Sequence, residues 1–178
     1  VLGFYGLGFF LPSIISGLSG LSLTTVGYLV TIPYVAALVG LVIVGKLSDK
    51  KKERKKHAAI SLIIGATGLG LSILVYPNLF LSMIMFIVAT VGIYSAFGPF
   101  WSIPTIFLTE TSAAVSIGMI NSIGNLGGFV GPYITGYIKT STGSFAGGEM
   151  FMVASIFVAA ILIFILQKAK PLHVQSEN

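Results

Sequence analysis

Two asparagines, Asn121 and Asn125, lie four residues apart inside a long apolar stretch that is rich in glycine. Residues at spacings of three and four share one face of a helix, so both carboxamides point to the same side. Such a face can hydrogen-bond a bound solute through its amide donors and acceptors. It can equally contact a neighbouring helix, since amides in apolar helices often make packing contacts of about 0.6–2 kcal/mol. A polar cavity wall and a helix–helix contact are both compatible with the sequence.

Aromatic residues beside breaks in the backbone form a second group of candidates. Tyr94 and Trp101 share a helix face with Gly98, and the following Pro99 removes a helix hydrogen bond. We expect this break to serve as a gate or as a stacking platform for a small organic acid. Trp101 is also explained by the ordinary enrichment of aromatic residues at a membrane surface. Two further tyrosines are candidates of the same kind, Tyr5 and Tyr34.

Glycines in the same stretch as the asparagines predict close helix packing. Gly124 with Gly128, and Gly127 with Gly131, are pairs of small residues four positions apart, which let two helix backbones approach closely. Pro132 follows, and it should kink the helix because it lacks a backbone donor. We therefore predict a packing face at the glycines and either a permanent bend or a gating hinge at Gly131 and Pro132.

A compact basic segment between two apolar runs carries most of the charge. Residues 46–56 hold seven of the ten Lys and Arg residues. Short loops rich in Lys and Arg stay on the cytoplasmic side of a membrane, so this segment predicts orientation. Within it, Asp49 can also stabilise the N-terminus of a facing helix by about 0.3–1 kcal/mol. Gly45, Asp49 and Arg54 are therefore candidates for a conformational role, and the alternative is a solvated loop that only sets topology.

Composition excludes most other classes of protein. The chain is 55% hydrophobic and 8% charged, whereas a soluble domain carries about 25% charged residues. The absence of cysteine removes disulfides, thiolate metal sites and cysteine nucleophiles. No paired carboxylates or metal-ligand cluster stand out, so we predict neither enzyme activity nor a cofactor or metal. The net charge of +5 comes mainly from one segment beside membrane-length runs, which argues against nucleic-acid binding.

The apolar runs that position these residues number six. About 20 apolar residues cross a hydrocarbon core of about 30 Å, and the segments must be helical because lipid offers no partner for backbone N–H and C=O groups. We predict an all-α polytopic protein of the plasma or inner membrane, folded as one six-helix bundle, with segment 46–56 and the C-terminal tail cytoplasmic. Val1 is not a start Met, so we expect the chain to begin inside a larger protein. The predicted spans are 1–18, 24–44, 58–75, 79–100, 113–138 and 150–167.

Short motifs occur together in an order that a known family shares. They are Tyr5-Gly6, Phe10-Leu11-Pro12, Gly27-Tyr28-Leu29, Ile32-Pro33-Tyr34, Gly45-Lys46-Leu47-Ser48-Asp49 with Glu53-Arg54, Gly98-Pro99-Phe100-Trp101 and the stretch from Ile120 to Pro132. With these motifs the chain resembles the C-terminal six-helix half of a twelve-helix major facilitator superfamily transporter. Within that superfamily it is most similar to the anion:cation symporter family, which includes permeases for tartrate, phthalate and sugar acids.

The resemblance implies a secondary active transporter that works by alternating access. It implies proton-coupled uptake of a small organic carboxylate, with the lipid bilayer and an N-terminal six-helix half as partners. It also implies that the segment around Asp49 latches the two halves and favours the outward-facing state. Two alternatives remain open: a major facilitator transporter of a neutral or sugar substrate, and a self-contained six-helix scaffold or channel.

Ionisable residues are missing from the middle of every predicted span. Such residues usually mark proton or ion pathways in membrane proteins, so we expect the proton-binding and carboxylate-binding charges to lie outside this chain. Glu110 and Glu149 lie near predicted helix starts, where the helix dipole explains them without a role in transport.

Overall fold

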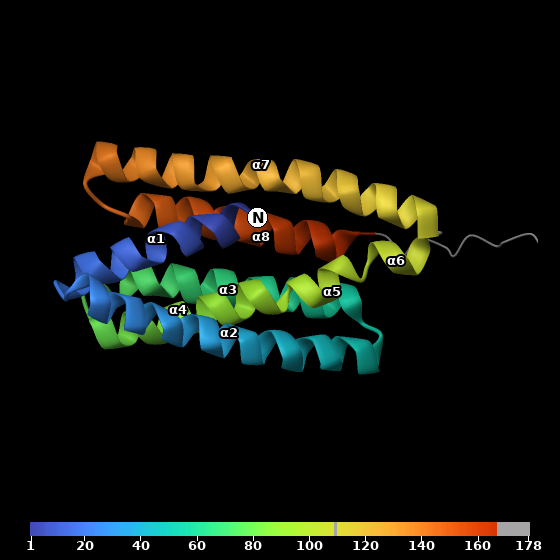
Figure 1. Ribbon diagram of the computed structural model, residues 1–178, viewed down its shortest axis with the longest axis horizontal. Coiled ribbons are helices and arrows are strands. Elements are labelled where there is room, and N and C mark those ends of the chain that lie inside the picture. The colour runs from blue at the N-terminus through green and yellow to red at the C-terminus, as the bar shows by residue number, and fades with distance from the viewer. Residues whose placement is uncertain (109, 167–178) are drawn as a thin grey trace, which may run out of the picture.

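The protein is an elongated α-helical bundle in the computed structural model, which describes residues 1–108 and 110–166 (Figure 1). Six helical segments in these ranges are long and apolar enough to cross a membrane, so the prediction of an all-α polytopic protein is confirmed. The helices are α1 (Leu2–Ser19), α2 (Leu23–Lys51), α3 (Arg54–Leu74), α4 (Leu79–Ser95), α5 (Phe97–Trp101), α6 (Pro104–Phe107), α7 (Glu110–Thr142) and α8 (Ala146–Ile165).

Local sequence explains where the first helices begin and end. Helix α1 ends at Gly20, whose φ of 62° suits a residue without a side chain. Ser22 then caps α2 by accepting a hydrogen bond from the Thr25 N–H. Asn78 caps α4 in the same way through the Leu81 N–H. These caps fix tight turns at the end of the bundle away from the basic segment.

The basic segment 46–56 differs from the predicted loop. Helix α2 continues through it to Lys51 and α3 begins at Arg54, so only Lys52 and Glu53 lie outside the helices. Lys50 and Lys51 occupy the last turn of α2, where positive charge is favourable beside the helix C-terminus. The end of an apolar run marks the edge of the hydrocarbon and not the end of the helix, which is why hydropathy placed this boundary too early.

The predicted fourth span is divided into two helices. Pro99 has no N–H to donate to the Ser95 carbonyl, and the chain turns at Ala96 between α4 and α5. Pro104 then occupies the first turn of the short helix α6, a position that tolerates proline. The prolines therefore produce breaks at this end of the bundle, and the first break lies one turn before Pro99.

Glycines bring α3 and α4 into backbone contact at the centre of the bundle. A Cβ atom on Gly92 would lie 2.2 Å from the Gly65 nitrogen, and one on Gly68 would lie 2.7 Å from the Ala89 nitrogen. Neither position has room for a side chain. In Figure 1, α7 lies along one edge of the bundle and α2 along the opposite edge, with α1, α3 and α8 between them. The buried core comes mainly from α1, α3, α4 and α8, and Leu11, Leu69, Phe86 and Met152 are among its side chains.

Helix α7 is the least buried of the membrane-length helices. Only 6% of its most apolar stretch of 18 residues is buried, whereas 50% of the corresponding stretch is buried in the segment Leu79–Trp101. It extends beyond the predicted span 113–138 at both ends, and α8 begins four residues before the predicted 150. Gln167, the last residue of the predicted sixth span, lies outside the described residues, and so does the tail that we predicted to be cytoplasmic.

Candidate functional site

Five aromatic side chains from four helices form one cluster. Phe4 lies at its centre, with ring centroids 4.8 Å from Tyr94, 5.0 Å from Phe97 and 5.1 Å from Tyr5. Tyr34 joins through Tyr94 at 5.7 Å. We call Phe4, Tyr5, Tyr34, Tyr94 and Phe97 the aromatic cluster. Three of the predicted tyrosines are thus brought together, although they are far apart in the sequence.

Backbone breaks and glycines position this cluster. Pro33 is buried inside α2, and its carbonyl oxygen lies 3.0 Å from Thr90 Oγ1 of α4, which ties the two helices together beside Tyr34. On the other side, a Cβ atom on Gly128 would lie 2.9 Å from the ring of Tyr5. Helix α7 can therefore contact that ring only because residue 128 has no side chain.

The two asparagines contact each other on the exposed face of α7. The Asn125 Nδ2 donates to the Asn121 Oδ1 at 3.0 Å, and both residues are exposed. The amide pair therefore does not form a contact between helices within the described part of the chain. Its remaining donors and acceptors are available to a solute or to another polypeptide.

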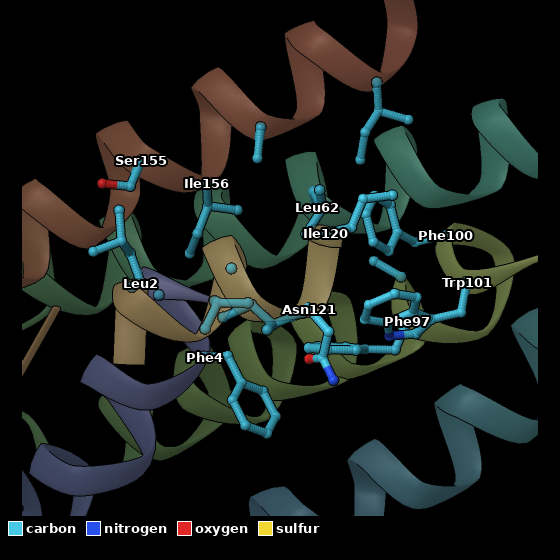
Figure 2. Close-up of a pocket in the computed structure, with 18 of the residues that line it drawn as sticks. Leu2, Phe4, Leu62, Phe97, Phe100, Trp101, Ile120, Asn121, Ser155 and Ile156 are labelled. Carbon is cyan, nitrogen blue, oxygen red and sulfur yellow. The ribbon is translucent and has the colours of Figure 1, made fainter. Parts of the chain in front are cut away.

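An apolar cavity of about 390 Å³ opens beside Asn121 (Figure 2). We call it the inner cavity, because it lies toward the end of the bundle that carries the basic segment. Asn121 and Trp101 both line it, together with Phe4 and Phe97 of the aromatic cluster. Asn125, Tyr5, Tyr34 and Tyr94 do not line this cavity. The remaining walls are mostly aliphatic and come from α1, α3, α4, α7 and α8, with Phe100 of α5.

Glycines of α7 pack directly on α1 next to this cavity. A Cβ atom on Gly131 would lie 2.5 Å from the Leu2 carbonyl oxygen, and one on Gly127 would lie 3.1 Å from the Leu2 nitrogen. The predicted packing face of α7 is therefore present. Helix α7 continues through Pro132 to Thr142, and a gating motion at Gly131 and Pro132 stays a prediction.

The remaining gating candidates form two contacts near the basic end. A Cβ atom on Gly98 would lie 3.9 Å from the Gly45 Cα, which places α5 beside α2 at two glycines. Pro99, next to Gly98, is buried. Asp49 pairs with Arg54 across the α2–α3 turn. The predicted latch carboxylate thus has a partner within its own segment.

Two further contacts hold the α2–α3 turn. Lys56 Nζ lies 2.6 Å from Glu53 Oε1, and this hydrogen bond and charge hold the pKa of the Glu53 carboxyl below its usual range. Lys55 Nζ donates to the Leu166 carbonyl at 2.8 Å, which links the turn to the end of α8. The basic segment is therefore an ordered structure.

Reasoning from the sequence did not predict the contact between Glu149 and Ser72. Glu149 lies in the first turn of α8, as expected for a helix-start carboxylate, but it is only 5% exposed. Its Oε2 lies 3.0 Å from the Ser72 Oγ of α3. No local pattern signals this contact, because the two residues are 77 positions apart.

Comparison with known proteins establishes the family. The sequence model of the Major Facilitator Superfamily matches residues 1–178. The chain belongs to the major facilitator superfamily. The prediction drawn from the motifs is confirmed, and the six-helix bundle corresponds to half of the fold of a major facilitator transporter.

Several relatives of this major facilitator chain are named as transporters. A protein named as a tartrate transporter from Agrobacterium vitis is 40% identical over 99% of this chain and 39% of its own length. A quinolone resistance transporter from Acinetobacter baumannii is 35% identical, covering 98% of this chain and 41% of that protein. The inner membrane transport protein RhmT of Escherichia coli is 35% identical over 92% of this chain and 38% of its own length. The chain therefore spans about two fifths of the length of the curated relatives it matches.

Proposed function

We propose that the intact protein imports a small organic carboxylate together with protons by alternating access. In this proposal the six-helix bundle supplies one wall of the central substrate cavity, and a second six-helix half supplies the other. The observation that carries the proposal is the inner cavity, where the amide of Asn121 and the indole of Trp101 meet the edge of the aromatic cluster. The name of the tartrate transporter relative supports the choice of substrate class.

The chemistry of the inner cavity suits one part of such a substrate. Phe97, Trp101 and Phe4 offer faces and edges for a carbon skeleton, and Asn121 offers a donor and an acceptor for a hydroxyl or carboxyl group. No Lys or Arg lies among the described lining residues. The charge of a bound carboxylate therefore needs a cation from the second half, at the interface where major facilitator transporters bind substrate.

The apolar lining favours a second candidate function. A cavity without a cation also suits a neutral or aromatic compound, and one relative is named as a quinolone resistance transporter. The intact protein would then carry such a compound through the same cavity. A sugar substrate or a self-contained scaffold or channel lacks a comparable supporting observation.

Orientation and the latch belong to the same proposal. The basic segment and the end of α8, which Lys55 contacts at Leu166, face the cytoplasm, because positive residues in short connections stay inside. Asp49 and Arg54 form the part of the bundle that contacts the second half when the cytoplasmic side closes. Their pairing with each other holds the carboxylate at the surface of the α2–α3 turn.

Uptake into proteoliposomes tests the proposal. The intact protein is reconstituted and given labelled tartrate with an inwardly directed proton gradient, and then the same label with the gradient collapsed by an ionophore. We expect accumulation only with the gradient, and competition by other small hydroxy acids. Competition by quinolones but not by hydroxy acids would instead support the second candidate. Equal, passive entry of unrelated solutes would favour a channel and contradict both.

A further inference from the structure

A second cavity lies at the opposite end of the bundle from the basic segment. We call it the outer pocket; its volume is about 410 Å³. It is enclosed by the ends of α1 and α3, by Phe86 of α4 and by the turn between α7 and α8. Unlike the inner cavity, it has several polar groups in its lining: Ser72, Tyr76, Lys139, Ser144 and Glu149.

The carboxyl group in this pocket is buried and has a hydroxyl partner. Glu149 is 5% exposed and Ser72 is 2% exposed. The Ser72 Oγ lies 3.0 Å from Glu149 Oε2 and also 2.6 Å from the Leu69 carbonyl oxygen. A hydroxyl has one proton to donate, so Ser72 cannot satisfy both acceptors at once.

This geometry describes two hydrogen-bond states. When Glu149 is ionised, the Ser72 hydroxyl donates to the carboxylate. When Glu149 binds a proton, its own O–H donates to Ser72 Oγ, and Ser72 donates to the nearer acceptor, the Leu69 carbonyl. Each of the two hydroxyl protons then has an acceptor. A proton can therefore bind here without any rearrangement of the helices.

The lysine that lines this pocket does not neutralise the Glu149 carboxylate in place of a proton. Lys139 of α7 and Tyr76 after α3 are the titratable groups that line the pocket with Glu149, and the lining residues of α1 and α4 are apolar. Lys139 Nζ donates to the Gly143 carbonyl at 2.6 Å and lies 4.6 Å from the centre of the Phe145 ring. Within the described residues Glu149 has no salt bridge. Burying an unpaired carboxylate is costly, and binding a proton removes that cost.

We propose that Glu149 and Ser72 form a proton-binding site that is loaded from the outer pocket. Proton binding at this site is independent of the substrate, whereas its role in coupling rests on the proposed proton-linked transport. The proposal also alters our sequence-based expectation that all proton-binding charges lie outside this chain. Because the pair joins α8 to α3, its state of protonation sets whether this contact between the two helices carries a charge.

Infrared difference spectroscopy tests proton binding without any substrate. Spectra of the purified intact protein are compared between about pH 9 and about pH 4, a range that includes the ordinary glutamate pKa of about 4.3. Exposed carboxyls also bind protons at about pH 4, so we expect the acid form to show a buried-carboxyl component of the protonated carboxyl band, which is lost in Glu149→Gln and retained in the control Glu53→Gln. Ser72→Ala should keep the band but shift its frequency, because the carboxyl loses its hydroxyl partner. A band spectrum unchanged by Glu149→Gln would overturn the proposal, and the Ser72→Ala result covers the case in which the glutamine variant fails to fold.

A transport comparison separates the role in coupling from the proposed function. Labelled tartrate is followed in proton-gradient-driven uptake and in counterflow, where substrate exchanges without net proton movement. For Glu149→Gln we expect driven uptake to fall about tenfold, which is a typical size for coupling between two sites, while counterflow is retained. Driven uptake as large as that of the unaltered protein would exclude Glu149 from coupling. If the unaltered protein ignores the gradient but the carboxyl band belongs to Glu149, the proposed function fails and the proton site stands.

Discussion

The inner cavity and the outer pocket are similar in size, at about 390 and 410 Å³, but opposite in chemistry. The inner cavity has aromatic and aliphatic walls with the amide of Asn121 and lies between helices that glycines bring close together. The outer pocket holds a buried carboxyl, a buried hydroxyl and a lysine at a helix turn. The difference agrees with our two proposals, which assign an organic solute to one region and a proton to the other. It also shows that volume alone does not identify a site in this fold.

A substitution that disturbs helix packing beside the inner cavity should cause the largest loss of stability and uptake. Gly131→Ala places a Cβ atom where the Leu2 carbonyl oxygen would be 2.5 Å away, so α7 must move off α1. We expect overpacking to cost about 1–3 kcal/mol and to abolish most tartrate uptake by displacing the cavity wall. Thermal unfolding of the intact protein in detergent, together with uptake, measures both effects.

Gly118→Ala is the matched control on the same helix. No atom lies within 4 Å of a Cβ atom at this position, and alanine favours a helix over glycine by about 1 kcal/mol. This variant should be as stable as the unaltered protein or slightly more stable. If both alanine variants behaved alike, close packing of α7 on α1 would not be what shapes the inner cavity.

Removing the Asn121 amide from the inner cavity should have a smaller effect, which is confined to substrate affinity. Asn121→Ala removes a hydrogen bond to a charged or hydroxylated solute, and we expect a loss of about 1–2 kcal/mol, or roughly five- to thirtyfold in affinity. Asn125→Ala is the control, because Asn125 contacts Asn121 but does not line the cavity. Tartrate affinity is measured by competition in counterflow. A larger loss of tartrate affinity in the Asn125 variant would indicate that the substrate binds nearer to Asn125 and farther from Trp101.

Much of this comparison could be predicted from the sequence, and its limits have physical causes. Spacing placed Asn121 and Asn125 on one face and the glycines in a packing face because both properties belong to a single helix. Spacing could not select Phe4 and Phe97 from the thirteen phenylalanines, since a ring facing lipid and a ring in the aromatic cluster look alike in an apolar run. The burial of Glu149 depends on where α3 passes α8, and only the fold determines that.

Removing the charge of the proposed latch carboxylate, Asp49, should shift the balance between conformations modestly. If Asp49 stabilises a helix end of the second half, Asp49→Asn removes about 0.3–1 kcal/mol of that contact. The outward-facing population should then fall by less than about fivefold, as measured by accessibility of reporter cysteines on each side of the membrane. Arg54→Gln removes the partner of Asp49 and leaves the carboxylate free, so it should preserve or increase that population. Unchanged populations in the Asp49 variant would leave the segment with a role in topology alone.

The smallest effect is expected on the pH dependence of stability from Glu53, an exposed carboxyl at the basic end that contrasts with the buried Glu149. Lys56 lowers the pKa of Glu53 in the folded protein, so the ionised pair adds stability above the unfolded glutamate pKa of about 4.3. That contribution is lost as the pH falls through the lower folded pKa. Thermal unfolding across this acid range should therefore show a slight loss of stability that Glu53→Gln removes. Because Glu53 is exposed, water and salt weaken the pair, and raising the ionic strength should reduce this pH dependence. A large dependence of stability on pH that is insensitive to salt would contradict this account of an exposed, screened pair.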